Sequence, residues 1–247
     1  MPLRNFIFQV FGWLVGLPLE FLVVSALWRG PYRRFPLLFA YITASLVLTL
    51  VEVALYTESF CTHSRAIWSL AARDFWLNEG ILDVLILATV INLIDQGISA
   101  SRWRRLAILG LSVGAFLYAS ISLFVHYRPP PENVGYWMTP WSRDMSVCAT
   151  VLDLGLWMTL IASRKTDRRL LLISGALGMQ FTGEAIGEAI RQLSMPNMVD
   201  ALSLTGSVVA MLANLACLYV WWRTFRSPRE PAIQQKSRED LRLHGSP

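Results

Sequence analysis

The sequence predicts an all-α polytopic membrane bundle of seven transmembrane helices in a chain of 247 residues. Hydrophobic residues make up 54% of the chain and charged residues only 16%, whereas a soluble domain carries about 25% charged residues. The mean hydropathy is +0.45. The apolar residues gather in seven stretches, each long enough for the roughly 20 helical residues that cross a bilayer. This pattern excludes a disordered chain, a nucleic-acid-binding domain and an ordinary cytosolic enzyme.

The first three stretches are separated by short polar breaks. The first, 6–28, is too long for the apolar region of a signal peptide, so we expect a retained helix. Arg29-Gly30-Pro31 ends it, because glycine and proline favour turns. The second stretch follows at 36–57. The third covers 68–94 and ends before a polar segment that starts at Gly97.

The fourth stretch, 105–125, precedes the longest connection, which contains Pro129-Pro130-Pro131. The last three stretches are 142–163, 169–190 and 202–222. Residues 1–226 therefore form one transmembrane domain. Residues 227–247 contain three prolines and no apolar periodicity, so we expect a short, disordered cytoplasmic tail.

The basic residues predict the orientation of the bundle. Sixteen of the 22 lysines and arginines follow the first, third, fifth and seventh stretches. They are Arg29, Arg33, Arg34, Arg102, Arg104, Arg105, Arg164, Lys165, Arg168, Arg169, Arg223, Arg226, Arg229, Lys236, Arg238 and Arg242. Because basic residues concentrate in cytoplasmic loops, we expect the N-terminus outside and the C-terminus in the cytoplasm. This alternation requires an odd number of spans, which supports seven independently.

Seven acidic residues lie well inside these stretches, where an ionised Asp near the bilayer centre costs about 2.5–3.5 kcal/mol. They are Glu20, Glu52, Glu79, Asp83, Asp153, Glu184 and Glu188. Counting from the basic clusters places Glu20 and Asp153 near the middle of the membrane and the other five toward its outer side. Spacing puts Glu79 and Asp83 on one helical face, and it does the same for Glu184 and Glu188.

Two interpretations of these acids remain open. In the first, an outward-facing polar pocket binds a cation, an amine or a proton between the second, third and sixth helices, with help from the fifth. Its lining residues are Glu52, Glu79, Asp83, Asp153, Glu184 and Glu188. In the second, internal ion pairs and hydrogen bonds hold the bundle together, with Arg73, Arg143 and Arg191 as candidate partners. Glu20 and Asp153 fit both interpretations equally well.

The sequence argues against several kinds of chemistry. The three histidines, His63, His126 and His244, fall outside the predicted spans, so no span carries a histidine pair for zinc. The chain has no Cys-x-x-Cys motif for thiol–disulfide exchange, and the seventh stretch has no lysine for a retinal Schiff base. We therefore expect no enzymatic activity, metal, cofactor or nucleic-acid partner. Cys61 and Cys148 both lie toward the outer side, where an oxidising periplasm would allow them to pair.

Three segments carry a resemblance to other proteins: Tyr32-Arg33-Arg34-Phe35-Pro36-Leu37-Leu38-Phe39-Ala40-Tyr41, Trp76-x-x-Glu79, and the end of the seventh stretch around Trp221. Together they resemble an orphan family of bacterial seven-helix integral membrane proteins with no established activity. The resemblance covers the transmembrane region and not the tail. It implies a multi-pass protein of the bacterial inner membrane and no catalytic assignment.

Three functions remain open. The leading hypothesis is a receptor-like or sensory protein in which a small cationic ligand shifts the helices, and the basic cytoplasmic face passes on the change. The alternatives are a small proton- or cation-coupled transporter and a structural membrane partner without a ligand. A closed inner half would favour sensing, whereas a repeat with broken midplane helices would favour transport. In each case the expected partners are the lipid bilayer and anionic lipid headgroups at the cytoplasmic face.

Overall fold

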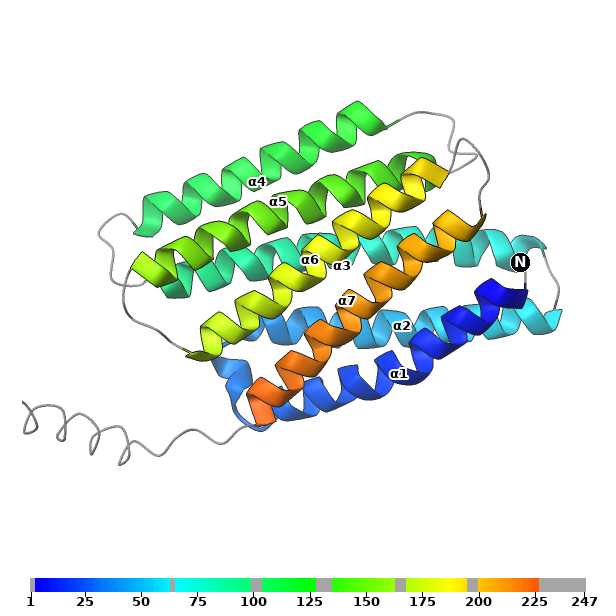
Figure 1. The fold of residues 1–247 in the computed structure, drawn as a ribbon, viewed down its shortest axis with the longest axis horizontal. Helices are drawn as coiled ribbons and strands as arrows, with labels where there is room; N and C mark the ends of the chain where they lie inside the picture. Colours follow the sequence, from blue (N-terminus) through cyan, green and yellow to red (C-terminus); the bar gives the residue numbers. More distant parts are fainter. Residues whose placement is uncertain are drawn as a thin grey trace, which may run out of the picture.

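The computed structural model describes residues 3–62, 65–98, 104–127, 135–162, 168–194 and 200–226. Within these ranges the protein is all-α, with seven α-helices and no strand, as the sequence predicts (Figure 1). All seven helices are long and apolar enough to cross a membrane. They are α1 (Leu3–Trp28), α2 (Pro36–Thr62), α3 (Arg65–Gly97), α4 (Arg104–His126), α5 (Gly135–Ala162), α6 (Arg168–Ser194) and α7 (Asp200–Arg226). One turn of 3-10 helix, η1 (Pro31–Arg33), joins α1 to α2.

Each helix covers its predicted stretch to within one residue, and several extend further. The largest difference is in α5, which begins at Gly135 rather than at residue 142 and includes Pro140. Pro18 likewise lies inside α1. Membrane helices tolerate such prolines because neighbouring groups can satisfy the freed backbone carbonyl. The tail at 227–247 and the connection at 128–134 lie outside the described residues.

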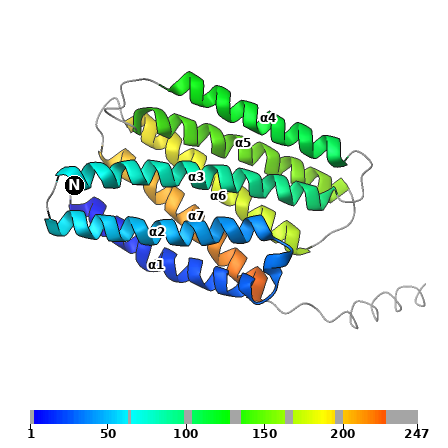
Figure 2. The same cartoon turned by 180° about the vertical axis from the view of Figure 1, so that it is seen from behind.

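Six of the helices form a closed ring. Going round it, α1 packs against α2, α2 against α3, α3 against α5, α5 against α6, α6 against α7, and α7 against α1. Helix α4 stays outside this ring and packs against α5 and α3 (Figures 1 and 2). The chain order therefore differs from the spatial order, since α3 and α5 are neighbours although α4 separates them in sequence.

The two ends of the ring differ in composition. We call the end where α1, α3, α5 and α7 finish the basic end, and the opposite one the far end. Fully buried apolar side chains fill the ring toward the basic end. The largest of these are Trp221, Phe35, Leu27, Leu38, Ile42, Leu93 and Ile173. The Trp221 indole also donates a hydrogen bond of 3.2 Å to the carbonyl oxygen of Ile173, which joins α7 to α6.

The most extensive helix contact lies between α6 and α7 and includes small residues. A Cβ atom built on Gly187 would lie 2.6 Å from the carbonyl oxygen of Gly206, and one built on Gly206 would lie 2.5 Å from that of Gly187. Gly183 faces Ala213 in the same contact. Because lipid tails are as apolar as leucine, membrane helices associate through such close van der Waals packing rather than through water exclusion.

Candidate ligand-binding site

A cavity of about 310 Å³ lies inside the six-helix ring, from the middle of the bundle toward the far end. All six ring helices line it, whereas α4 contributes nothing. Two aromatic residues, Trp13 and Tyr41, line it. Its polar and charged lining residues are Glu20, Ser45, Thr49, Glu52, Glu79, Asp83, Ser142, Gln180, Glu184, Glu188, Arg191 and Asn214. Five of the six predicted pocket residues thus lie on one cavity wall, and Asp153 does not.

The centre of the cavity brings together acids from α3 and α6. Asp83 is only 7% exposed and lies close enough to Glu79 and Glu184 to interact with both electrostatically. Glu184 accepts hydrogen bonds from the Gln180 amide at 2.9 Å and from the Ser146 hydroxyl at 3.3 Å. The Oδ2 atom of Asp83 is buried and has no hydrogen-bond partner among the described residues. A buried acceptor of this kind is costly unless a donor reaches it.

Arg191 is the single basic residue among those that line the cavity. Its guanidinium forms an ion pair with Glu188, three residues earlier on α6. Arg191 also interacts electrostatically with Glu79 and Glu184. Arg191 is thus a partner of the acids, as the second sequence interpretation expects, and its one guanidinium faces several carboxyl groups.

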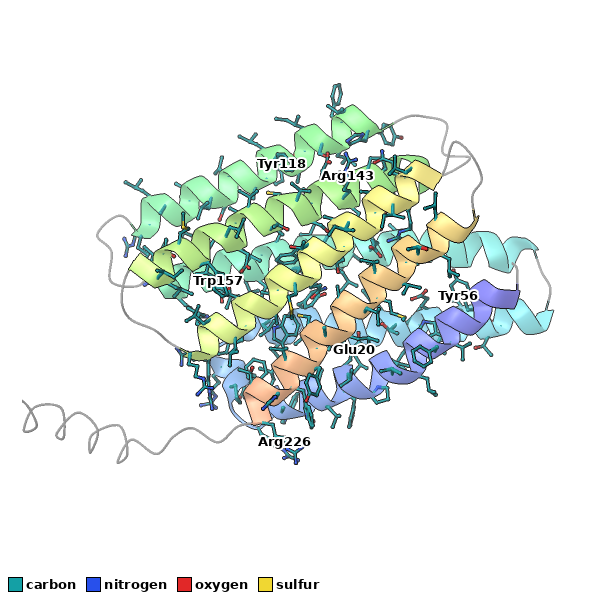
Figure 3. All side chains as sticks on the ribbon, viewed as in Figure 1. Glu20, Tyr56, Tyr118, Arg143, Trp157 and Arg226 are labelled. Carbon is teal, nitrogen blue, oxygen red and sulfur yellow. The ribbon has the colours of Figure 1, made fainter. Side chains whose placement is uncertain are left out.

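Helix α1 forms a wall of the cavity, although the sequence interpretation did not count it among the lining helices. Glu20 on α1 is 4% exposed and accepts a hydrogen bond of 2.6 Å from the Ser45 hydroxyl on α2 (Figure 3). Its second oxygen, Oε2, is buried and lacks a partner among the described residues. Gly12 and Gly16 precede Glu20 at four-residue intervals and line the same cavity. This spacing is the signal in the sequence that could have assigned α1 to the wall.

Asp153 lies in a different contact, between α5 and α6. It is 2% exposed and accepts a hydrogen bond of 2.5 Å from the Ser174 hydroxyl. Gly178 lies beside its other oxygen, since a Cβ atom built there would come within 2.9 Å of Oδ2. Asp153 therefore joins two helices and does not face the cavity, although its depth in the sequence resembles that of Glu20.

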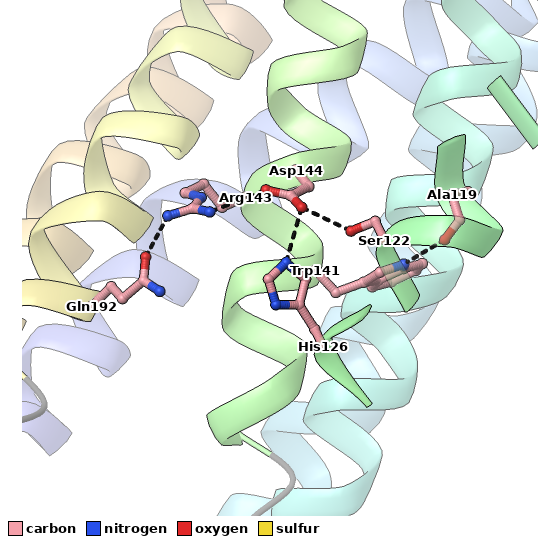
Figure 4. Close-up of polar contacts among 7 residues, drawn as sticks. All are labelled: Ala119, Ser122, His126, Trp141, Arg143, Asp144 and Gln192. Carbon is pink, nitrogen blue, oxygen red and sulfur yellow. Dashed lines mark hydrogen bonds and ion pairs between the residues drawn. The ribbon is translucent and has the colours of Figure 1, made fainter. Parts of the chain in front are cut away.

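Arg143, one of the predicted partners of the cavity acids, belongs instead to a separate polar cluster. It donates hydrogen bonds to Gln192 on α6 at 2.5 Å and to Asp144 at 3.2 Å (Figure 4). Asp144 also accepts a hydrogen bond of 2.8 Å from Ser122 and lies 3.1 Å from Nε2 of His126, both on α4. Asp144 thus attaches the outer helix to the ring. It is the third residue of the predicted range 142–163, so sequence reasoning placed it at a helix end and missed it.

Two further predictions concern residues at the far end. The side chains of Arg73 and Cys61 lie outside the described residues, so the structure does not test their predicted partners. Cys148 carries a free, half-buried thiol. Among the described side chains, no three carboxyl, imidazole or thiol groups converge in an arrangement that could hold a metal ion.

Comparison of the chain with protein-family models, with curated proteins and with solved structures gives no match. The resemblance to orphan bacterial seven-helix proteins therefore rests on its three sequence segments. Any functional conclusion has to come from the geometry of the bundle itself.

Proposed function

We propose that this chain is an integral membrane protein with a receptor-like or sensory function, and that its acidic cavity binds a small organic cation. One observation carries the proposal. Six carboxyl side chains and a single guanidinium line one cavity inside the helix ring. The carboxyl groups outnumber the guanidinium six to one. A cation that binds from outside would therefore stabilise the charged forms of these carboxyl groups.

The atoms of the cavity wall suit an ammonium group. Asp83 Oδ2 and Glu20 Oε2 are buried acceptors without a partner among the described residues, and an ammonium group supplies N–H donors. Trp13 and Tyr41 add aromatic faces, which attract cations within about 6 Å of the ring centre. The volume of about 310 Å³ falls at the lower end of the range for small-molecule sites, roughly 300–1,000 Å³.

An organic cation fits better than a metal ion. Calcium needs six to eight oxygen ligands at about 2.3–2.6 Å, which requires several carboxyl groups to converge on one point. The described side chains offer no such group of three, whereas an ammonium group needs only a few acceptors at hydrogen-bond distance. The cavity therefore supports an amine as the ligand class.

The packed basic half favours sensing over transport. Trp221, Phe35 and Leu38 are at most 2% exposed and fill the ring between the cavity and the basic end. The aromatic ring of Tyr41, on the cavity wall, meets the Trp221 ring edge-on at 6.2 Å. A transported cation would have to pass through these contacts. A bound cation can instead change the positions of the helices that carry them.

The proposal includes an orientation and a location. The protein would lie in the inner membrane of a bacterial cell. Its basic end would face the cytoplasm and its N-terminus would lie outside, because basic loops stay in the cytoplasm. A reporter that is active only in the cytoplasm should be active when fused after Arg105 or Arg226. It should be silent in the loop at Pro129–Pro131, and the reverse pattern would contradict the orientation.

The ligand class can be tested by thermal unfolding of the full-length protein in mild detergent. Choline, putrescine, spermidine and tyramine are added one at a time and compared with sodium chloride at equal ionic strength. An amine present at a hundred times its Kd stabilises the folded state by about 2.7 kcal/mol, which raises Tm by roughly 5–10 °C for a chain of this size.

Two matched variants make the test specific. Asp83→Asn should abolish the shift in Tm, because it removes a charge from the cavity wall. Asp153→Asn changes an equally buried acid outside the cavity and should keep the full shift. The ligand hypothesis fails if no amine exceeds the salt control, or if both variants respond alike, and the structural interpretation then replaces it. Uptake of a stabilising amine into proteoliposomes would support the transporter alternative.

A further inference from the structure

A second cavity, of about 710 Å³, lies at the basic end of the bundle. It is formed by the ends of α1, α6 and α7 and by the turn that follows α1. The residues that line it are Leu22, Ser25, Ala26, Arg29, Gly30, Pro31, Arg169, Trp222, Phe225 and Arg226. None of these lining residues is acidic, in contrast to the cavity inside the ring.

Three arginines from separate helix ends meet at this cavity. Arg29 follows α1 and Arg169 lies in the first turn of α6. Arg226 is the last residue of α7 and is labelled in Figure 3. A guanidinium presents several N–H donors in a planar fork, which matches the oxygen atoms of a phosphate group. The charge and the donor geometry both indicate a phosphate-bearing ligand.

The positions of Arg29 and Arg226 have local causes. Gly30 has a φ angle of 142°, which L-residues rarely adopt, and this allows the chain to turn directly after Arg29. The Arg226 guanidinium lies over the Trp222 ring, 5.0 Å from its centre. This cation–π contact holds the guanidinium beside the cavity.

The cavity is apolar on the side that lies deeper in the bundle. Leu22, Ala26 and Arg29 share one face of α1, and Leu22 lies about 10 Å deeper than Arg29 along the helix axis. Leu22 is also 39% exposed. On α7, Trp222 and Phe225 line the same cavity next to Arg226. Arginines at the rim above apolar side chains match a lipid, with its charged headgroup above its acyl chains, whereas a free phosphate would use only the rim.

We propose that this cavity is a binding site for the phosphodiester headgroup of an anionic phospholipid, held by Arg29, Arg169 and Arg226, with an acyl chain beside Leu22. Basic pockets between membrane helices are known to hold such headgroups. The inference needs the chain to lie in a membrane, but it does not depend on the ligand of the acidic cavity.

Native mass spectrometry of the full-length protein tests this site. The protein is released from mild detergent after titration with phosphatidylglycerol or with zwitterionic phosphatidylcholine. We expect one tightly bound phosphatidylglycerol and no comparable phosphatidylcholine. Arg29→Gln and Arg226→Gln should each weaken phosphatidylglycerol binding about fivefold, since each basic contact contributes about 1 kcal/mol, and the double variant about 25-fold.

Arg105→Gln is the matched control, because it removes one exposed arginine at the same end, on α4, away from the cavity. It should bind the lipid as the unmodified protein does. Equal losses in Arg105→Gln and Arg29→Gln would overturn the proposal in favour of diffuse attraction to the lipid surface. Equal retention of phosphatidylcholine, or displacement of phosphatidylglycerol by inorganic phosphate at the same concentration, would also overturn it. Asp83→Asn should leave lipid binding unchanged, which separates this result from the amine test.

Discussion

Replacing Gly187 by alanine should weaken the contact between α6 and α7. The new Cβ atom would lie 2.6 Å from the carbonyl oxygen of Gly206, which is about 0.8 Å short of the 3.4 Å at which ordinary contact begins. It would also lie 3.0 Å from the Cβ of Ala210. The nearest atom belongs to the backbone, so no side-chain rotation relieves the clash, and the two helices have to separate. Overpacking of this kind costs about 1–3 kcal/mol.

The matched control is Gly155→Ala on α5, where a Cβ atom would meet nothing within 4 Å. Alanine stabilises a helix relative to glycine by about 0.5–1 kcal/mol, and this gain is common to both variants. The difference in unfolding free energy between them therefore isolates the clash, and we expect it to be about 1–3 kcal/mol.

Unfolding in mixed micelles with increasing sodium dodecyl sulfate, followed by circular dichroism, measures this difference. Gly187→Ala should unfold at less denaturant than Gly155→Ala, which should match or exceed the unmodified protein. If the two variants unfold together, then α6 and α7 do not approach as closely as the structure has them. The part of the acidic cavity that these two helices line would then also have a different shape.

Three further substitutions test other contacts. Glu188→Gln should lower the free energy of unfolding by about 1.5–3 kcal/mol, because it replaces the charged partner of the largely buried Arg191 by an amide. An unchanged thermal unfolding midpoint would show that the ion pair is dispensable. Asp144→Asn should weaken the attachment of α4 to the ring. Amide hydrogen exchange, measured by mass spectrometry, should then speed up more in α4 than in α5, and an equal change in both helices would contradict this. Gly30→Ala should cost about 1–3 kcal/mol in thermal unfolding because of its φ of 142°, whereas Gly110→Ala, in a helix with nothing near its Cβ, should not destabilise the protein.

The helices could be predicted from the sequence because the bilayer requires a minimum length of contiguous apolar residues. That signal is local, so each stretch identifies its own helix without knowledge of the others. The ends were less well predicted. Residues 65–67, which include Arg65, and residues 95–97, which include Asp95 and Gln96, continue α3 beyond its apolar stretch, since backbone hydrogen bonding extends a helix past the point where hydropathy falls.

The order of the helices around the ring could not be predicted in this way. It depends on contacts between distant segments, such as the contact of α3 with α5 that leaves α4 outside. This explains why Asp153 was grouped with the cavity acids. Its depth in α5 is similar to that of Glu20, which lines the cavity, but its side chain faces Ser174 at a helix contact. The depth of a residue in the membrane follows from its position along one helix. The direction in which its side chain faces depends on how the neighbouring helices pack.

The two cavities share three of their lining helices. Helices α1, α6 and α7 line the acidic cavity through Glu20, Glu184 and Asn214, and they line the arginine cavity through their other ends. The close packing of α6 against α7 at Gly187 and Gly206 holds these two helices together as a pair. Any displacement that a cation causes in this pair would therefore move both helices together relative to α1. Such a movement changes the distances among the three arginines at the basic end, so a receptor built in this way would couple cation binding to lipid contacts at the opposite end.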